Sequence, residues 1–174
     1  MENHQLINNM TNQNVFDIFN DKYSLKAIDI CPLLKKFSIN IVNDFDTEHA
    51  KEVSLDVNDT FSYYLNKSSD DASKTYAEII VNYDLCSRLG LTTSEIMAAV
   101  AHEIGHIILF FRIDKNINEG QAEEVYGDMY ACRMGLARPL YTLLQKLIDS
   151  GLYPDIQNQV LKNRIHFIKP YITP

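Results

Sequence analysis

Hydrophobic residues follow helical spacing through most of the second half of the chain. Residues 92–111 are apolar on nearly every side, which predicts a helix buried in a core. Thr92 with Glu95 three residues later has the pattern of a capping box, so this helix is expected to begin there. Asn118 with Gln121 three residues later predicts the start of a second helix, over 118–135, and apolar positions at helical spacing predict two more, over 138–150 and 154–169. Gly135 is expected to end the first of these three.

The first half has shorter and more polar patterns. Two helical stretches are expected at about 14–22 and 29–37, with Asp29 as N-cap and Pro32 in the first turn. Alternating apolar residues then predict strands at 38–43, 52–58, 60–66 and 76–83. An order of helices, then a small sheet, then helices predicts an α+β fold, with a mainly antiparallel sheet of about three to four strands.

Length, charge and cysteine content narrow the class of protein. A chain of 174 residues is expected to form a single domain over 1–174, with residues 1–12 flexible. The formal charge of −7, with no cluster of Lys or Arg, argues against a direct nucleic-acid surface. The three cysteines show no disulfide or CxxC spacing, and the polar N-terminus has no signal-peptide pattern. The longest apolar run, 104–111, is short for a bilayer. We therefore expect a cytoplasmic protein with no membrane contact.

The candidate chemistry lies in the middle of the 92–111 helix, where the sequence is HEIGH. Residues four apart share a helix face, so His102 and His106 can direct two imidazoles at one point. In HExxH metallopeptidases the two histidines hold zinc and the glutamate, here Glu103, is the general base. Burying these groups is costly without a partner, and a metal ion would supply one. Gly105 lowers helix stability, which suggests that another element approaches closely there.

A third ligand is expected on the next helix. Catalytic zinc sites have three protein ligands and one open position. Glu124 and Asp128 are four residues apart on one helical face, so Glu124 is predicted as the third ligand. Asp128 is predicted to accept the outer N–H of a ligand histidine, although it could instead pair with Arg133. Glu123 lies about 100° away and is the alternative ligand. The predicted cofactor is one zinc ion per chain.

The HEIGH motif followed by Glu-x-x-x-Asp at 124–128 resembles the gluzincin metallopeptidases. The wider layout is similar to the ImmA/IrrE family of small metallopeptidases: AIDICPLL at 27–34, IIVN at 79–82, VA at 100–101 and YAC at 130–132. The chain departs from that family after the second motif helix, where it continues with RMGL at 133–136 and two more predicted helices. The resemblance implies a zincin-like helical core with the metal site between two helices.

The same resemblance implies a zinc-dependent endopeptidase acting on a protein or peptide. Zinc would activate a water molecule, and Glu103 would move its proton to the leaving amine. The resemblance also implies a transcriptional repressor as substrate. The oxyanion donor stays open among Tyr126, Tyr130 and the Tyr63–Tyr64 region. If segment 77–82 is a sheet edge, it could hold the substrate by β-augmentation.

Two other functions fit the same residues. One is a non-catalytic module that binds a partner and keeps a structural metal, against which the intact Glu103 argues. The other is a metallopeptidase-like toxin or effector, which the small size allows.

Overall fold

The computed structural model describes residues 19–35, 38–42, 60–66, 76–112 and 121–172. The chain divides into two compact units, 1–87 and 88–174. The strand expected at 52–58 and the flexible segment expected at 1–12 lie outside the described residues, and the single domain stays a prediction. Helices and a small sheet together confirm the α+β class.

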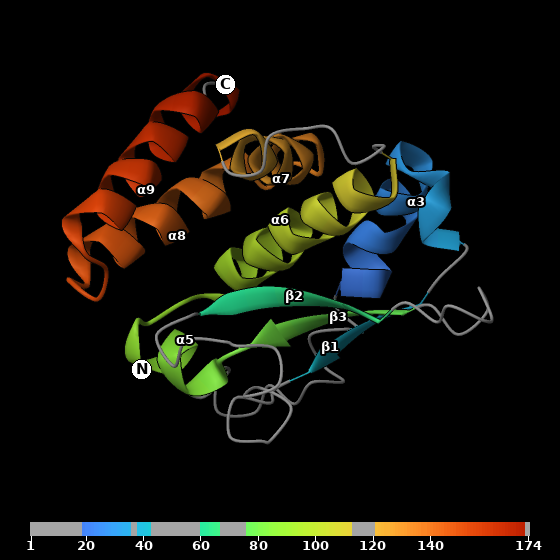
Figure 1. The fold of residues 1–174 in the computed structure, drawn as a ribbon, viewed down its shortest axis with the longest axis horizontal. Coiled ribbons are helices and arrows are strands. Elements are labelled where there is room, and N and C mark those ends of the chain that lie inside the picture. The colour runs from blue at the N-terminus through green and yellow to red at the C-terminus, as the bar shows by residue number, and fades with distance from the viewer. Residues whose placement is uncertain (1–18, 36–37, 43–59, 67–75, 113–120, 173–174) are drawn as a thin grey trace. The chain divides into compact units, whose positions relative to one another are not determined.

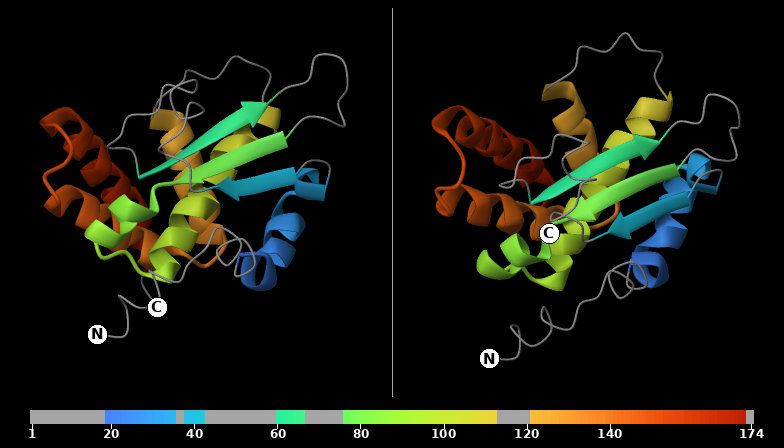
Figure 2. Two further views of the ribbon diagram at one scale, coloured as in Figure 1. Left: turned by 90° about the horizontal axis from the view of Figure 1, so that it is seen from below. Right: turned by 60° about the horizontal axis from the view of Figure 1, so that its bottom comes forward.

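The sheet belongs to the first unit. It contains β1 (Ser38–Val42), β2 (Phe61–Asn66) and β3 (Tyr76–Val81), in the order β1-β3-β2. Strand β3 pairs with β1 in parallel and with β2 in antiparallel orientation. Figure 2 shows β3 between the other two strands. The expectation of a mainly antiparallel sheet therefore holds for only one of the two described strand pairs.

The central position of β3 overturns the idea that it could receive a substrate strand. Both of its edges are paired, and the side chains of Ala77, Ile79, Ile80 and Val81 are buried. β-Augmentation needs an exposed edge with unpaired N–H and C=O groups. Segment 77–82 therefore contributes to the core of the first unit and does not bind a peptide by strand addition.

Strand β3 is also two residues shorter than expected, because Asn82 starts a helix. The side-chain Oδ1 of Asn82 accepts a hydrogen bond from the Leu85 N–H at 2.9 Å, which caps α5 (Tyr83–Arg88). Helix α5 was not predicted from the sequence, and Tyr83, expected at the end of the strand, is its first residue. Asn82 was the available signal, since asparagine is among the preferred N-cap residues.

The N-terminal helical segment also differs from expectation. It consists of the π-helical turn η1 (Asn20–Ser24), continued by α3 (Leu25–Ile30), and the 3₁₀ turn η2 (Pro32–Lys35). Asp29 lies in the last turn of α3 and does not start a helix. The reason is Pro32, which disfavours helical backbone in the preceding residue. Cys31 is accordingly extended, with φ −140° and ψ 96°.

The described residues of the second unit form four α-helices, and the sequence predicted each of them. They are α6 (Thr93–Arg112), α7 (Gln121–Arg133), α8 (Ala137–Asp149) and α9 (Asp155–Ile168), followed by the 3₁₀ turn η4 (Lys169–Tyr171). Helix α6 packs against α7 and α8, and α9 packs against both α7 and α8. Figure 1 shows α8 and α9 side by side as a hairpin.

The start of α6 confirms the predicted capping box. The Thr92 N–H donates to Glu95 Oε2 at 2.6 Å, and the Glu95 N–H donates to Thr92 Oγ1 at 3.3 Å. Leu91 and Ile96, at the positions of a hydrophobic staple, are both fully buried. The first turn of α6 is thus fixed by residues within five positions of one another.

The end of α7 confirms the role predicted for Gly135. This residue has a φ of +81°, a left-handed conformation that favours glycine. Its N–H donates to the Cys132 carbonyl, and the Leu136 N–H donates to the Ala131 carbonyl, both at 3.0 Å. This pair of hydrogen bonds is the Schellman motif, which satisfies the last carbonyls of a helix.

Helix α6 is unusually long and apolar for a helix of this small unit. The stretch Thr93–Phe111 is long and apolar enough to cross a membrane by those two criteria alone. Most of it is buried inside the protein, where α7 and α8 cover it. Such burial is what the central helix of a packed core shows.

Candidate metal centre

The two histidines of the HEIGH motif lie on the buried face of α6. Their side chains are only about 6% exposed, and their Nε2 atoms lie 2.8 Å apart. The helical spacing of four residues places the rings one turn apart, with ring centroids separated by 4.5 Å. The expected convergence of two imidazoles on one point is confirmed.

Two glycines bring α7 against this face. A Cβ atom built on Gly105 would lie 2.7 Å from the Cα of Gly127, and one built on Gly127 would lie 2.6 Å from Nδ1 of His102. Neither position has space for a side chain, so α6 and α7 touch through their backbones. This contact confirms the close approach predicted from Gly105, whereas Gly127 was not singled out from the sequence.

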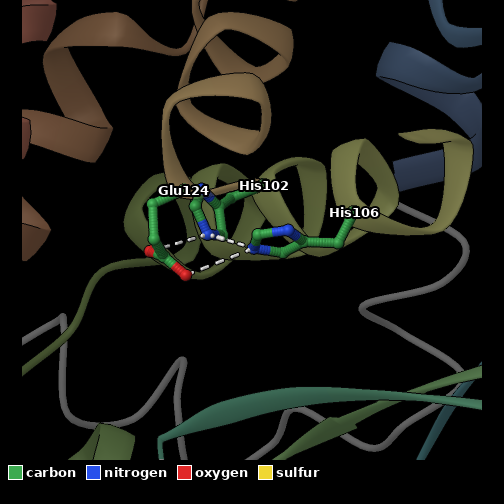
Figure 3. A group of neighbouring side chains, drawn as sticks. All are labelled: His102, His106 and Glu124. Atoms are coloured by element: carbon green, nitrogen blue, oxygen red, sulfur yellow. Dashed lines mark hydrogen bonds and ion pairs between the residues drawn. The ribbon is translucent and has the colours of Figure 1, made fainter. Parts of the chain in front are cut away.

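The close contact places Glu124 opposite both histidines. Its Oε2 lies 3.6 Å from Nε2 of His102, and its Oε1 lies 3.6 Å from Nε2 of His106. Figure 3 shows the three side chains pointing toward one another, two from α6 and one from α7. Their ligand atoms all lie within 4.8 Å of one another. Among the described residues, this is the one group of three or more His, Cys, Asp or Glu side chains arranged to hold a metal ion, and it contains Glu124 and not Glu123.

Asp128 supports His102 from the other side of the ring. It is fully buried, and its Oδ1 lies 2.9 Å from Nδ1 of His102. A carboxylate can only accept, so Nδ1 carries the proton and Nε2 presents its lone pair to the centre. Arg133 is exposed, and Asp128 forms its ion pair with Arg164 instead. The predicted interaction of Asp128 with a ligand histidine is thus present, and the alternative with Arg133 is not.

Arg164 on α9 is the residue that the sequence analysis missed. Its Nε donates to Asp128 Oδ2 at 3.0 Å, its Nη2 to Asp128 Oδ1 at 2.7 Å, and its Nη1 lies 2.7 Å from Glu124 Oε2. Its Nη2 is also 3.2 Å from Nδ1 of His102. The available signal was its place in the sequence. Arg164 falls on the same helical face as Leu161 and Ile168, which are buried, and a charge in an apolar stripe calls for a partner.

These contacts set the charge state of the centre. Burial alone would raise the pKa of Asp128, but the hydrogen bond from His102 and the charge of Arg164 hold this pKa below its usual value. Burial, together with His102 and Arg164, lowers the pKa of His106 to about 3. His106 is therefore neutral near physiological pH, which is the form that binds metal.

Glu103 lies beside His102 on α6 and is buried, with 9% of its surface exposed. It is close enough for its charge to act on Arg164 and raise the pKa of that guanidinium, against the opposing effect of burial. Of the tyrosines considered as oxyanion donors, Tyr130 is buried and its Cβ lies 3.0 Å from a Cβ placed on Gly105. Its Cβ thus belongs to the α6–α7 contact. Tyr126 is half-buried, and Tyr63 belongs to the first unit.

The donor set fits a divalent metal ion. Two neutral imidazoles and one carboxylate are the ligands of catalytic zinc sites, with Zn–N distances of about 2.0–2.1 Å. Two nitrogens bound tetrahedrally at that length would lie about 3.3 Å apart, so the histidine pair would open by roughly half an ångström. No protein-family model matches the chain, and neither a curated protein nor a solved structure does. The centre must therefore be judged by its own geometry.

Proposed function

We propose that this protein is a zinc-dependent endopeptidase of the gluzincin type, with one zinc ion per chain. The observation that carries the proposal is the convergence of His102, His106 and Glu124 from two helices, with Asp128 fixing the His102 tautomer. The HExxH spacing adds Glu103 next to the ligands, where the chemistry needs a base. The proposed zincin-like core is the pair α6 and α7.

In this proposal each residue has one task. His102, His106 and Glu124 hold the metal, and Asp128 keeps His102 in the tautomer that binds it. A bound zinc ion supplies a Lewis acid that polarises the scissile carbonyl and acidifies a water molecule. Glu103 accepts the proton of that water and returns it to the leaving amine. Burial of Glu103 supports this role, because a base shielded from solvent exchanges its proton with the substrate and not with bulk water.

The number of ligands favours an enzyme over a binding module. Structural zinc sites are closed by four protein ligands, whereas catalytic sites have three and leave a position for water. The cluster among the described residues has three. The resemblance to the ImmA/IrrE family supports a protein substrate, and a transcriptional repressor is the class of substrate that it implies.

The first test is metal content. We expect about one zinc per chain in the wild type and in Glu103→Gln, and a sharp loss in His106→Ala and Glu124→Ala. Glu123→Ala is the matched control, because it removes the neighbouring carboxylate of the same helix and is expected to keep the zinc. A wild type that takes up no zinc from excess metal would refute the metal centre.

The second test is hydrolysis. The zinc-loaded wild type and Glu103→Gln are incubated with a library of proteome-derived peptides, and new termini are identified by mass spectrometry. Cleavage by the wild type alone is expected, since Glu103→Gln retains metal but lacks the base. Zinc binding without any cleavage of peptides or of intact helix-turn-helix repressors would favour the partner-binding module.

A further inference from the structure

The guanidinium of Arg164 lies against the residues proposed to hold the metal ion. Its side chain is only 13% exposed and lies against two of the groups that surround the proposed metal position. The guanidinium contacts Glu124, a proposed ligand, and its Nη2 lies 3.4 Å from Nε2 of His102, the atom that would bind the metal. A positive charge is thus packed directly against metal-binding atoms.

The charges around Arg164 explain why it lies there. Glu103, Glu124 and Asp128 are three carboxylates close enough to influence its pKa, and Arg164 is the one Lys or Arg side chain that the described contacts place among them. Buried carboxylates without a counter-charge are strongly unfavourable. Arg164 supplies that counter-charge through three hydrogen bonds or ion pairs of 2.7–3.0 Å.

We propose that Arg164 is an internal cation that neutralises the metal-free centre and competes with the metal ion for it. The inference rests on the metal centre proposed above. Metal and guanidinium share Glu124 and the negative charge of the same cluster, so each reduces the benefit gained from the other. Arg164 thereby stabilises the empty centre and lowers its affinity for metal, which makes it a positioning residue and not a ligand.

An opposite effect must be weighed. Arg164 also holds Glu124 and Asp128 in place, and loss of such supporting contacts typically weakens metal binding by about 10–100-fold. Repulsion is larger. Repulsion between two unit charges about 4 Å apart, at the effective dielectric constant of a protein, lowers a binding constant by roughly a thousandfold. A divalent metal ion carries two charges, so its repulsion from Arg164 is larger still. Asp128 offsets part of this repulsion, so the net expectation is tighter metal binding when the charge of Arg164 is removed.

The experiment compares zinc affinity in full-length, chelator-stripped protein by competition with a chromophoric chelator. Arg164→Gln removes the charge but keeps an N–H that can reach Asp128, and Arg164→Met removes both. Arg164→Lys keeps the charge. Lys162→Met is the matched control, because Lys162 is an exposed cation on the same helix and its loss changes the net charge equally. Thermal unfolding is followed with and without zinc.

We expect Arg164→Gln and Arg164→Met to bind zinc at least about tenfold more tightly than the wild type. Arg164→Lys and Lys162→Met should stay within about threefold of it. Without zinc, Arg164→Gln and Arg164→Met should unfold roughly 10 °C below the wild type. Adding zinc should raise the unfolding temperature of these two variants by more than it raises that of the wild type. A variant that folds only with zinc would support the proposal in the same way.

Weaker or unchanged zinc binding in both neutral variants would overturn the competition while leaving the metal centre intact. Equal losses of unfolding temperature with and without zinc would also overturn it, because they would show a merely structural role. If neither the wild type nor Arg164→Gln binds zinc, the inference and the metal centre fail together.

Discussion

Helix α6 takes part in two polar clusters, a small one around Glu95 near its start and a larger one around the two histidines at its centre. At the start, Glu95 is buried and pairs with Lys146 of α8 at 2.8 Å, and it accepts the Thr92 N–H. Lys146 also donates to the Gly90 carbonyl at 2.6 Å. At the centre, two histidines meet Glu124, Asp128 and Arg164. Both clusters join helices distant in sequence through carboxylate and cation.

The two clusters differ in how completely their charges are matched. One carboxylate faces one ammonium group at Glu95, and the backbone groups of Thr92 and Gly90 complete the contacts of the pair. The central cluster has three carboxylates against one guanidinium, and it includes the imidazole of His106, whose lowered pKa keeps it neutral. A balanced pair of one carboxylate and one ammonium group needs no further ion. A cation site instead requires an excess of negative charge and of atoms that offer lone pairs. Burial of a carboxylate alone does not distinguish the two.

The largest effect is expected from Asp128→Asn. It removes the buried anion between His102 and Arg164, and breaking such a pair typically costs about 3 kcal/mol or more. It also removes the acceptor that fixes the His102 tautomer, which should weaken zinc binding by about 10–100-fold. Chemical denaturation and zinc titration measure the two losses. Full zinc affinity in this variant would contradict the role given to Asp128.

Gly127→Ala tests whether the helix contact positions the cluster. The added Cβ would lie 2.6 Å from Nδ1 of His102 and 3.0 Å from its carbonyl oxygen, so the helices must separate at a cost of about 3 kcal/mol. Zinc affinity should fall as well. Gly151→Ala is the control, because it meets no atom within 4 Å and costs about 1–2 kcal/mol through its positive φ alone. Equal effects of the two changes would refute the positioning role.

Lys146→Met should separate the two clusters. Buried Glu95 would keep its Thr92 contact but lose its counter-charge, and we expect a loss of about 1–3 kcal/mol in the free energy of unfolding. Zinc stoichiometry and affinity should not change, because the described contacts of Lys146 are with Gly90 and Glu95, outside the central cluster. A loss of zinc in this variant would show that the two clusters are not independent.

The smallest effect concerns pH. Burial opposes ionisation of Glu95, but hydrogen bonds from Lys146 and Thr92 keep its pKa below the ordinary value of 4.5. The contribution of ionised Glu95 to the free energy of unfolding is therefore complete above that value, and it is lost as pH falls through the lowered pKa. Metal-free wild type and Glu95→Gln are compared by denaturation from neutral pH downward. The gap between them should shrink below about pH 4; a constant gap would contradict the assignment.

What the sequence predicted correctly depends on residues close together along the chain. The capping box of Thr92 and Glu95, the helix stop at Gly135 and the convergence of His102 with His106 each follow from spacings of a few residues. Glu124 was found because helical periodicity relates it to Asp128. In such cases backbone geometry alone determines which side chains meet.

What the sequence did not predict depends on contacts between distant segments. Arg164 reaches Asp128 from 36 residues away and His102 from 62, and Lys146 reaches Glu95 from 51. An alternating pattern indicates a strand but not its neighbours, so the central place of β3 and its parallel pairing with β1 were not foreseen. The zinc, the peptidase activity and the substrate stay predictions.

The position of Arg164 along the chain has a consequence for biosynthesis. Asp128 precedes it by 36 residues, so at a translation rate of about 5–20 residues per second the acids leave the ribosome roughly 2–7 s before the arginine. During that interval the nascent α6 and α7 can meet, but their own guanidinium has not yet emerged. Until Arg164 emerges, Glu124 and Asp128 lack its counter-charge. If the proposed metal centre forms, a metal ion would meet these carboxylates during translation without competition from the arginine.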